Sequence, residues 1–481
     1  AAANWQSDAE TIVYSGEPSV TRQAGTLDLS TQRSSRVSVV VSYKAVGHLD
    51  THGVYSVQAD RSSGTLTFKL DKVDGQWRIA SLPNGILISS VDFQQTYRQV
   101  QLYQRASSSK TLVPDNRWLS WRQWRTLAVN ELIRGAASYL GRAVSPVVDD
   151  NTSMHVDSVP VNNDGKTEVK LSDTSSMSES DLAMLVHQIR LTLGDGSPDY
   201  EIQVTDASGA DLSHVDDGID LAVNQPSMRL YSLSNSAIVS IASSNLIRLG
   251  EVGGAGIQAK GMAFSSSGGA VLREDGVAEC IDQSVKSCGM MFDGRQISVI
   301  AGGLDGEVWA VPKDSGVLLV SHDGKTSSFE TPWLEGYHVT GMAVSPEGSR
   351  LTVAASSADG RQGGVFMLGI QRKSNDAVVH LADSPICVSA QSDISAITFY
   401  NESTLVYAIR NAAGGYQQIA PGPQSVQTLP KNTVGLAAGL FDQTQSLFSM
   451  DGNGQIRCAR GALTSSWRTV DFQSNAISSG R

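Results

Sequence analysis

Two groups of residues in this sequence have side chains whose type and spacing could do chemistry. The first is cationic: residues 98–142 contain eight arginines and lysines against two acids, six net positive charges in a chain whose net charge is −11. The same stretch contains Trp118, Trp121 and Trp124. Cations beside aromatic rings can bind an acidic partner, a glycan or lipid headgroups. The candidate interface residues are Arg117, Arg122 and Arg125.

The same stretch has a second interpretation, as an amphipathic helix. Ser120 followed by Gln123 has the spacing of a capping box. Apolar residues then recur on one face at helical spacing, namely Trp121, Trp124, Ala128, Leu132, Ala136 and Leu140. On this interpretation, which we favour, the tryptophans belong to a core and the arginines are solvated or pair with acids of a neighbouring domain.

The second group is the cysteines, which all lie late in the chain. Cys280 and Cys288 are separated by seven residues, a spacing that two adjacent hairpin strands can bridge as a disulfide. Whether Cys387 and Cys458 pair stays open. Because no CxxC motif and no closely spaced pair of histidines accompanies them, the sequence predicts no metal site.

Other short motifs are more typical of turns than of catalysis. Residues 254–259 fit the loose GxGxxA form of a dinucleotide fingerprint, but a strand follows where that motif requires a helix. Gly-Lys-Thr at 165–167 and 324–326 lacks the earlier glycine of a phosphate loop, and the Asp-Gly clusters at 216–218 and 451–454 lack a full calcium loop. Since no GxSxG nucleophile elbow is present either, we expect no enzyme activity and no cofactor.

Length and composition indicate about three domains rich in β-structure. The chain has 481 residues, against ~100–200 for a typical domain. Its 18% charged residues and 45 glycines favour strands and turns over helical bundles. The negative net charge argues against a general affinity for nucleic acid or anionic lipid, both of which attract positive surfaces.

The beginning of the chain suggests a processed protein. No run approaches the ~18 apolar residues that a membrane-spanning helix needs. The first five residues include neither an initiator Met nor the apolar core of a signal peptide. We therefore expect trimming before Ala1, with any lipid attachment in a segment that precedes this sequence.

Residue patterns divide the chain into a first domain at 1–104, a second at 105–215 and a third at 216–481. In the first, alternating apolar residues and the hairpin turn Asp74-Gly75 predict a curved sheet, which Phe93, Tyr97 and Tyr103 would close. The second predicts an αββαβ unit: the helix from Ser120, strands at 154–161 and 167–171, a helix capped by Ser178 with Asp181 and ended by Gly194, and a strand at 200–204.

The third domain shows internal repeats. Similar strands open successive blocks at residues 261–265, 341–345, 394–399 and 434–438, and each leads through a turn to further strands. This order is typical of propeller blades. At ~40–45 residues per blade, we predict five or six blades. The predicted fold is thus multidomain and mainly β, a C-terminal β-propeller preceded by two small α+β domains.

The chain resembles the actinobacterial lipoprotein LpqB family, which has an N-terminal envelope domain, a middle GerMN domain and a β-propeller in this order. The resemblance is carried by Gly75-Gln76-Trp77-Arg78-Ile79, by residues 82–89 with Asp92-Phe93, and by Leu112-Val113-Pro114 with Arg117-Trp118. It covers essentially the whole chain. The lipid-bearing cysteine that the family implies lies outside this sequence.

The resemblance implies a non-catalytic, extracytoplasmic lipoprotein. It would be held on the outer face of the cell membrane by an N-terminal lipid, its one contact with the membrane. It would bind the extracellular domain of a sensor histidine kinase, MtrB, and so influence the response regulator MtrA in envelope growth and division. Because a fold does not decide a function, a module that binds cell-wall glycan and a propeller hydrolase or lyase stay open as alternatives, and so does an envelope assembly factor. A glycan-cleaving enzyme would place two carboxylates ~5–10 Å apart in the propeller channel.

Overall fold

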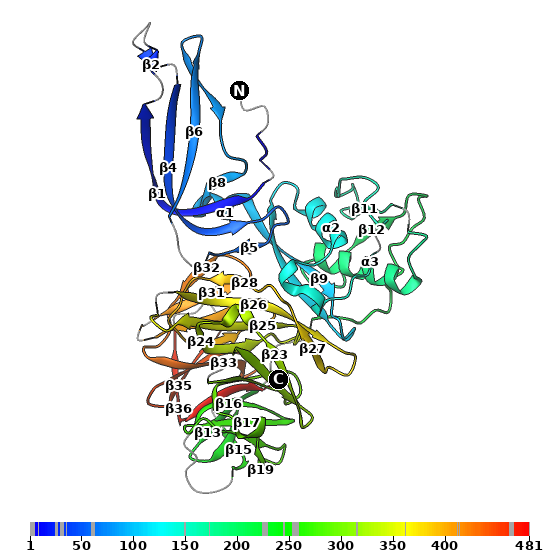
Figure 1. The fold of residues 1–481 in the computed structure, drawn as a ribbon. Helices are drawn as coiled ribbons and strands as arrows, with labels where there is room; N and C mark the ends of the chain where they lie inside the picture. The colour runs from blue at the N-terminus through cyan, green and yellow to red at the C-terminus, as the bar shows by residue number, and fades with distance from the viewer. Residues whose placement is uncertain are drawn as a thin grey trace.

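The computed structural model describes residues 5–480 except 8, 25–26, 29–32, 35, 59–62, 149–150, 173, 224–228, 244–245, 253–258, 314–315, 361, 411, 413 and 461–465. Figure 1 shows three parts: a sheet of long strands that projects from one end, a small helix-containing part beside it, and a propeller at the other end. The mainly β, multidomain fold that the sequence predicts is therefore confirmed.

The projecting part is a twisted sheet of long strands. Its main strands follow the order β7-β6-β4-β1-β8. The strands of this part are β1 (Thr11–Ala24), β4 (Arg36–Leu49), β5 (Tyr55–Ser56), β6 (Ser63–Val73), β7 (Gln76–Ser81) and β8 (Ile86–Ser89), with the separate pair β2 (Leu27–Asp28) and β3 (Arg33–Ser34). Asp74 and Gly75 form the predicted hairpin turn between β6 and β7, and both have positive φ. Helix α1 (Ser90–Thr96) then places Phe93 in the core under the sheet.

The prediction that Phe93, Tyr97 and Tyr103 close this sheet is correct in part, because Phe93 and the Tyr97 ring stacked on it pack in the core of the sheet. Tyr97 and Tyr103 add no strand to the sheet. Both residues lie in β9 (Tyr97–Arg105), which pairs antiparallel with β10 (Leu112–Ser120) as a separate ribbon. Strand β9 also packs against α2 (Trp124–Arg134) and α3 (Glu179–Leu193). The reason is packing, because the inward side chains of β9, Val100 and Leu102, complete the core of those two helices.

Of the two helix starts predicted in the middle part, the first is wrong and the second is confirmed. Ser120 does not cap a helix, because it is the last residue of β10, and α2 begins four residues later without a side-chain cap. In α3 the cap is as predicted: the Ser178 side chain accepts from the backbone N–H of Asp181, and Gly194 ends the helix. A short 3-10 helix, η1 (Ser138–Ala143), follows α2.

The remaining strands of the middle part are short. β11 (Thr167–Lys170) runs parallel to β12 (Ile202–Thr205), which matches two of the predicted strands to within a few residues. The strand predicted at 154–161 is reduced to isolated bridges at Met154 and Val161. Its polar and exposed stretch between them has too few apolar residues to pack as a strand.

Within the residues that the structure describes, the propeller has six blades, the upper of the two predicted numbers. Blades 1 to 3 are formed by β13 (Arg229–Ser234), β14 (Ala237–Ile241), β15 (Leu246–Glu251) and β37 (Ala476–Gly480); β16 (Ala259–Ser265), β17 (Gly268–Arg273), β18 (Ala278–Ile281) and β19 (Ser287–Met290); and β20 (Ile297–Gly302), β21 (Val308–Pro312), β22 (Val317–His322) and β23 (Lys325–Glu330). The short helices η2 (Phe292–Gly294) and η3 (Pro332–Leu334) follow blades 2 and 3.

Blade 4 has one strand more than the others. Blades 4 to 6 are formed by β24 (Tyr337–Val344), β25 (Arg350–Ser357), β26 (Gly363–Arg372), β27 (Val378–Leu381) and β28 (Ile386–Ser389); β29 (Ile394–Phe399), β30 (Thr404–Ile409), β31 (Gly415–Ile419) and β32 (Gln424–Gln427); and β33 (Thr433–Phe441), β34 (Thr444–Asp451), β35 (Gln455–Arg460) and β36 (Arg468–Gln473). In blade 4, β27 and β28 pair with different parts of the long β26.

The ring is closed by β37, the last of the described strands. β37 pairs with β13 of blade 1, and neighbouring inner strands are in contact in the order β37, β16, β20, β24, β29, β33 and back to β37. The predicted block openers are four of these inner strands. A Cβ at Gly341 would lie 2.9 Å from Cγ2 of Ile397 on the next inner strand, so a larger residue there would require the Ile397 side chain to move.

The cysteines of blade 2 are joined. Cys280 of β18 and Cys288 of β19 form a disulfide with their Cα atoms 5.1 Å apart, which links the two outer strands of the blade. Cys387 and Cys458 are free thiols. Burial raises the pKa of the Cys387 thiol to about 12, which leaves it protonated and unreactive near neutral pH.

We expect the double substitution Cys280→Ser/Cys288→Ser to lower the free energy of unfolding of the propeller by about 2–3 kcal/mol, because a loop of this length gains roughly that much from closure. Calorimetric melting of oxidised, reduced and substituted protein measures the change. Reduction must not affect the substituted chain, and equal melting temperatures for oxidised and reduced wild type would contradict the prediction.

Candidate interaction surface and interdomain junction

Strand β10 brings the three parts of the molecule together. Successive side chains of a strand point to opposite sides, so Asn116 and Trp118 point one way and Asp115 and Arg117 the other. Asn116 Nδ2 donates to the carbonyl oxygen of Ala420 at 2.7 Å, and Trp118 Nε1 donates to that of Pro421 at 3.2 Å. These bonds attach the strand to blade 5.

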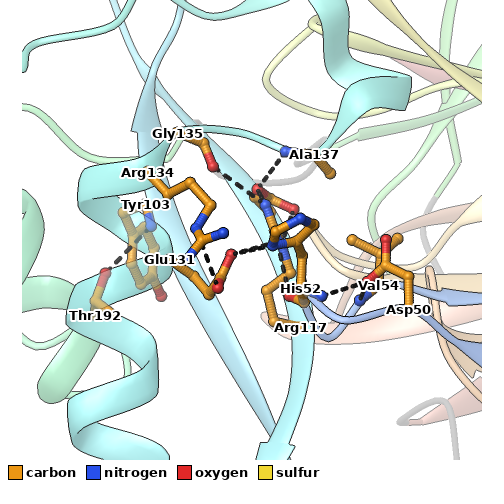
Figure 2. Close-up of polar contacts among 11 residues, drawn as sticks. Asp50, His52, Val54, Tyr103, Arg117, Glu131, Arg134, Gly135, Ala137 and Thr192 are labelled. Atoms are coloured by element: carbon orange, nitrogen blue, oxygen red, sulfur yellow. Dashed lines mark hydrogen bonds and ion pairs between the residues drawn. The ribbon is translucent and has the colours of Figure 1, made fainter. Parts of the chain in front are cut away.

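On the other side of β10, Arg117 and Asp115 form a buried ion pair. The Arg117 side chain is 2% exposed and that of Asp115 is fully buried. Arg117 donates to both carboxylate oxygens of Asp115, at 2.9 and 2.6 Å. It also donates to the carbonyl oxygens of His52 at 2.8 Å and Gly135 at 3.3 Å, and the N–H of Ala137 donates to Asp115 at 2.9 Å (Figure 2). The pair therefore connects the β4–β5 turn to the end of α2.

Glu131 and His52 extend this network toward solvent. His52 Nδ1 lies 3.2 Å from Glu131 Oε2, and Arg117 Nη1 lies 3.6 Å from the same oxygen (Figure 2). Burial raises the pKa of Glu131, and the nearby charges of Arg117, Arg134 and His52 oppose that shift only in part. Burial disfavours the charge of Arg117, but Asp115 and Glu131 outweigh it, and the Arg117 pKa is raised.

The β4–β5 turn fits closely against β10. Asp50 accepts from the N–H groups of His52 and Val54, which shapes the turn. Gly53 has a φ of +77°, and a Cβ there would lie 2.8 Å from the Leu119 side chain. The N–H of Trp118 donates to the carbonyl oxygen of Gly53 at 2.7 Å. Only a glycine permits this approach.

An apolar core shared by all three parts surrounds the polar network. One cluster of buried side chains combines Val54 of the projecting part, Tyr139 and Leu140 of η1, and residues of blades 4 and 5 such as Val365 and Tyr407. Backbone bonds add to it, since the N–H of Val57 donates to the carbonyl oxygen of Cys387 at 2.9 Å. This shared core holds the three parts in one arrangement.

The structure separates the three predicted interface residues. Arg117 is no interface residue, because a side chain enclosed by Asp115 and two carbonyl oxygens cannot contact a partner. Arg122 is exposed and Arg125 is half-buried. One feature of the sequence indicates that Arg117 pairs with Asp115. The two residues are two positions apart, so in a strand their side chains lie on the same side.

The prediction that Trp121 belongs to the apolar stripe of the helix is wrong. Trp121 precedes α2, and its side chain is 50% exposed, whereas Trp124 is buried. The Arg98 guanidinium lies 5.4 Å from the Trp121 ring and 4.1 Å from the Trp124 ring, and that of Arg125 lies 4.7 Å from the Trp124 ring. Arg98 also pairs with Asp195 at 2.7 Å. These ring contacts, with the exposed Arg122 next to Trp121 in the sequence, mark a cationic, aromatic surface. Arg98, Trp121, Arg122 and Arg125 are here called the Trp121 patch.

The propeller channel has a different character. It is a hollow of about 260 Å³ lined by the inner strands, with side chains such as Ser298, Thr340 and Ser395. Among its described lining residues Lys260 is the charged one, and no carboxylate lies there. The carboxylate pair that a glycan-cleaving enzyme would need is thus not found in the described part of the channel.

The other motifs are turns where the structure describes them. Asp323 and Gly324 form a two-residue hairpin turn with positive φ, and the Asp451 carboxylate accepts from the N–H groups of Asn453 and Gln455. Asp216 pairs with Arg190 at 2.8 Å. Of residues 254–259, all but the last lie outside the described residues. No group of three metal-ligating side chains, and no helix long and apolar enough to cross a membrane, occurs among the residues with described placement.

A six-bladed propeller fused through a buried junction to two smaller parts defines the chain as a multidomain β-propeller protein. Its sequence matches two family descriptions, "Lipoprotein LpqB, N-terminal domain" over residues 1–94 and "Lipoprotein LpqB beta-propeller domain" over residues 239–475. The chain belongs to the lipoprotein LpqB family, as the resemblance predicted.

Two relatives show how far the similarity extends. Lipoprotein LpqB of Bifidobacterium longum is 40% identical over 99% of this chain and 84% of its own length. Lipoprotein LpqB of Nocardia farcinica is 22% identical over 85% of this chain and 72% of its own length. Among solved structures, virginiamycin B lyase of Staphylococcus aureus matches with a TM-score of 0.30 and 10% identity, over 45% of this chain and 86% of that one, which carries no argument about function.

We expect Arg117→Ala to lower the free energy of unfolding by about 3–5 kcal/mol, because it leaves the buried Asp115 carboxylate without its partner. Arg122 is exposed and lies five residues after Arg117, so Arg122→Ala should change the free energy of unfolding by less than ~0.5 kcal/mol. Calorimetry measures both. A loss for Arg117→Ala no larger than that for Arg122→Ala would contradict the proposed role of the pair.

The raised pKa of Glu131 predicts a pH dependence. A carboxyl whose pKa is higher in the folded than in the unfolded protein costs stability when it ionises, so the cost is absent below the unfolded pKa of ~4.3 and grows as pH rises to the folded pKa. The carboxyl group begins to ionise at ~pH 4. Above that pH, the free energy of unfolding of the wild type should therefore fall relative to that of Glu131→Gln. Melting curves at several pH values test this, and a relative gain with rising pH would refute it.

Proposed function

We propose that the protein is a non-catalytic adaptor on the outer face of the cell membrane that binds the extracellular domain of an MtrB-type sensor kinase. Family membership supports an envelope lipoprotein, and the family name denotes no enzyme activity. The lipid would be attached before residue 1. The response regulator MtrA would sense the effect through the kinase.

The observation that carries this proposal is the Trp121 patch. It has three arginines, of which Arg98 is paired with Asp195, in a chain with a net charge of −11, and Trp121 is half exposed. Tryptophan and arginine are the residues that most often contribute large binding energies in protein interfaces. A cationic patch also speeds association with an acidic partner.

The junction explains how binding could influence a kinase. Because the network around Arg117 and the shared apolar core hold the three parts together, the Trp121 patch has a fixed position relative to the propeller. A rigid partner shifts a conformational equilibrium when it binds one state of the kinase more tightly than another. Equal affinity for both states would produce no signal.

The alternative is a module that binds cell-wall glycan. Exposed aromatic rings such as Trp121 also stack on sugars, so the same patch could serve it. This alternative predicts binding to purified cell-wall fragments in the absence of any kinase.

The first experiment measures binding of this chain to the purified kinase domain by calorimetry or interferometry. We expect saturable binding that weakens at least about thirtyfold in Trp121→Ala/Arg122→Glu. Replacing a central tryptophan and the neighbouring cation of an interface typically lowers the binding free energy by ~2 kcal/mol or more. Arg125→Glu should weaken binding as well, with folding checked because Arg125 stacks on Trp124.

Arg142→Glu is the matched control, since Arg142 is an exposed arginine of the same basic stretch outside the patch. It should bind like the wild type. Binding that survives the Trp121 and Arg122 changes would place the contact elsewhere. No binding at high micromolar concentration would reject the adaptor, and binding to cell-wall fragments instead would favour the glycan module.

A further inference from the structure

The projecting sheet has one face made of apolar side chains. Residues that lie opposite each other on neighbouring strands share a face. Val20 of β1, Val41 of β4 and Leu66 of β6 form one such row, and Val39 with Phe68 forms the next. The third row consists of the buried Val37, of Leu70 and of Ile79, the last of which lies on the edge strand β7. Trp77, two residues before Ile79 on β7, lies on the same face.

The opposite face of the same strands is polar. Thr21 and Thr67 flank Val40 there, and Ser38 lies opposite Lys69. With the exception of Val40, polar and apolar residues alternate, so the sheet is amphipathic, as is typical of a sheet that has one solvated face and one covered face.

The apolar face is left largely open. Trp77 is 38% and Ile79 is 43% exposed, Val20 is more exposed still, and Val39, Val41 and Phe68 are half-buried. None of these six side chains belongs to a packed apolar cluster of the described residues. A contiguous apolar face of this kind on a soluble domain marks an interaction site.

The charged residues that the strand pairings place on this face are both cations. Arg22 lies opposite Val39, and Lys72 lies opposite Trp77, so both cations stand among the apolar side chains. The Arg22 guanidinium lies 5.8 Å from the Trp77 ring. None of the residues that these strand pairings place on the face carries a carboxylate, and the exposed Glu17 lies in the β1 bulge between Ser15 and Ser19, where no pairing assigns a face. Tryptophan and cations around an apolar surface match the boundary between headgroups and acyl chains of an anionic bilayer.

We propose that the apolar face of the projecting sheet binds the surface of an anionic phospholipid bilayer. The negative net charge of the whole chain predicts no general affinity for anionic lipid. Electrostatic attraction to a bilayer, however, acts only within about a Debye length, ~8–10 Å, so the cations on this face determine whether the face binds. Figure 1 shows the sheet at the end of the molecule away from blades 1 and 2, which leaves it free to meet a membrane.

The entry of the chain fits this orientation. The N–H of Gln6 donates to the Asn84 side chain at 3.1 Å, and the N–H of Gly85 donates to the carbonyl oxygen of Gln6 at 2.8 Å, so the first described residues run beside the β7–β8 turn. A lipid attached before residue 1, which is part of the proposed function, would thus enter the membrane next to this sheet. One lipid chain alone holds a protein weakly, and a second contact makes the attachment stable.

The test is sedimentation of the chain, which carries no lipid, with phosphatidylcholine vesicles that do or do not contain phosphatidylglycerol. We expect binding to the anionic vesicles that falls with added salt. Trp77→Ser/Ile79→Ser should weaken it at least about tenfold, and Arg22→Gln or Lys72→Gln about fivefold each. Both residues of the pair are exposed on an edge strand, so the substituted sheet should fold, which circular dichroism checks.

The matched control is Ile247→Ser/Leu249→Ser on β15, an outer propeller strand with an equally spaced apolar pair that is 60% and 41% exposed. It should bind vesicles like the wild type. As a second measurement, brominated lipids should quench less tryptophan fluorescence in Trp77→Phe than in the wild type, although both bind.

Failure to bind anionic vesicles, or equal binding by Trp77→Ser/Ile79→Ser, overturns the proposal. Self-association in ultracentrifugation that this double substitution abolishes would assign the face to a second copy of the chain instead. Because no kinase domain is present in these assays and no lipid in the kinase binding assay, either proposal can fail without the other.

Discussion

The rest of the structure depends on the buried Arg117–Asp115 ion pair in β10. Two charges removed from water are stable only when every remaining donor and acceptor is satisfied. Here the partners come from the β4–β5 turn through His52 and from the end of α2 through Gly135 and Glu131. Satisfying the pair therefore holds two parts of the molecule together, while the other side of the same strand is bonded to blade 5.

This arrangement has a functional consequence for a protein that acts by binding. A chain of loosely linked domains could engage each partner independently, but a fused body presents its surfaces at fixed separations. The Trp121 patch lies at the start of α2, and the projecting sheet, whose strands carry the apolar face, lies at the end of the molecule away from blades 1 and 2 (Figure 1). Membrane and kinase would thus be held at a defined distance, with the propeller extending away from the sheet.

Much of the fold was predictable because it rests on local patterns. Turns such as Asp74-Gly75, the α3 cap at Ser178 and the inner propeller strands each contain a residue type that favours the local structure. Prediction failed where a residue's role depends on distant partners. Ser120 has the spacing of a helix cap, but it is the last residue of β10 and pairs with Tyr97 of β9. Trp121 fits the helical spacing of the apolar stripe, but the helix begins only at Trp124.

The sequence by itself determined the fold class, the order of the parts and the family, because alternation, turn residues and repeats act over a few residues. It also showed a basic stretch, since charge is a property of composition. Only the tertiary structure decided which arginines are exposed: burial of Arg117 follows from strands and turns separated by up to 65 residues along the chain. The same holds for the apolar sheet face, whose alternating residues the sequence displayed while the packing left them uncovered.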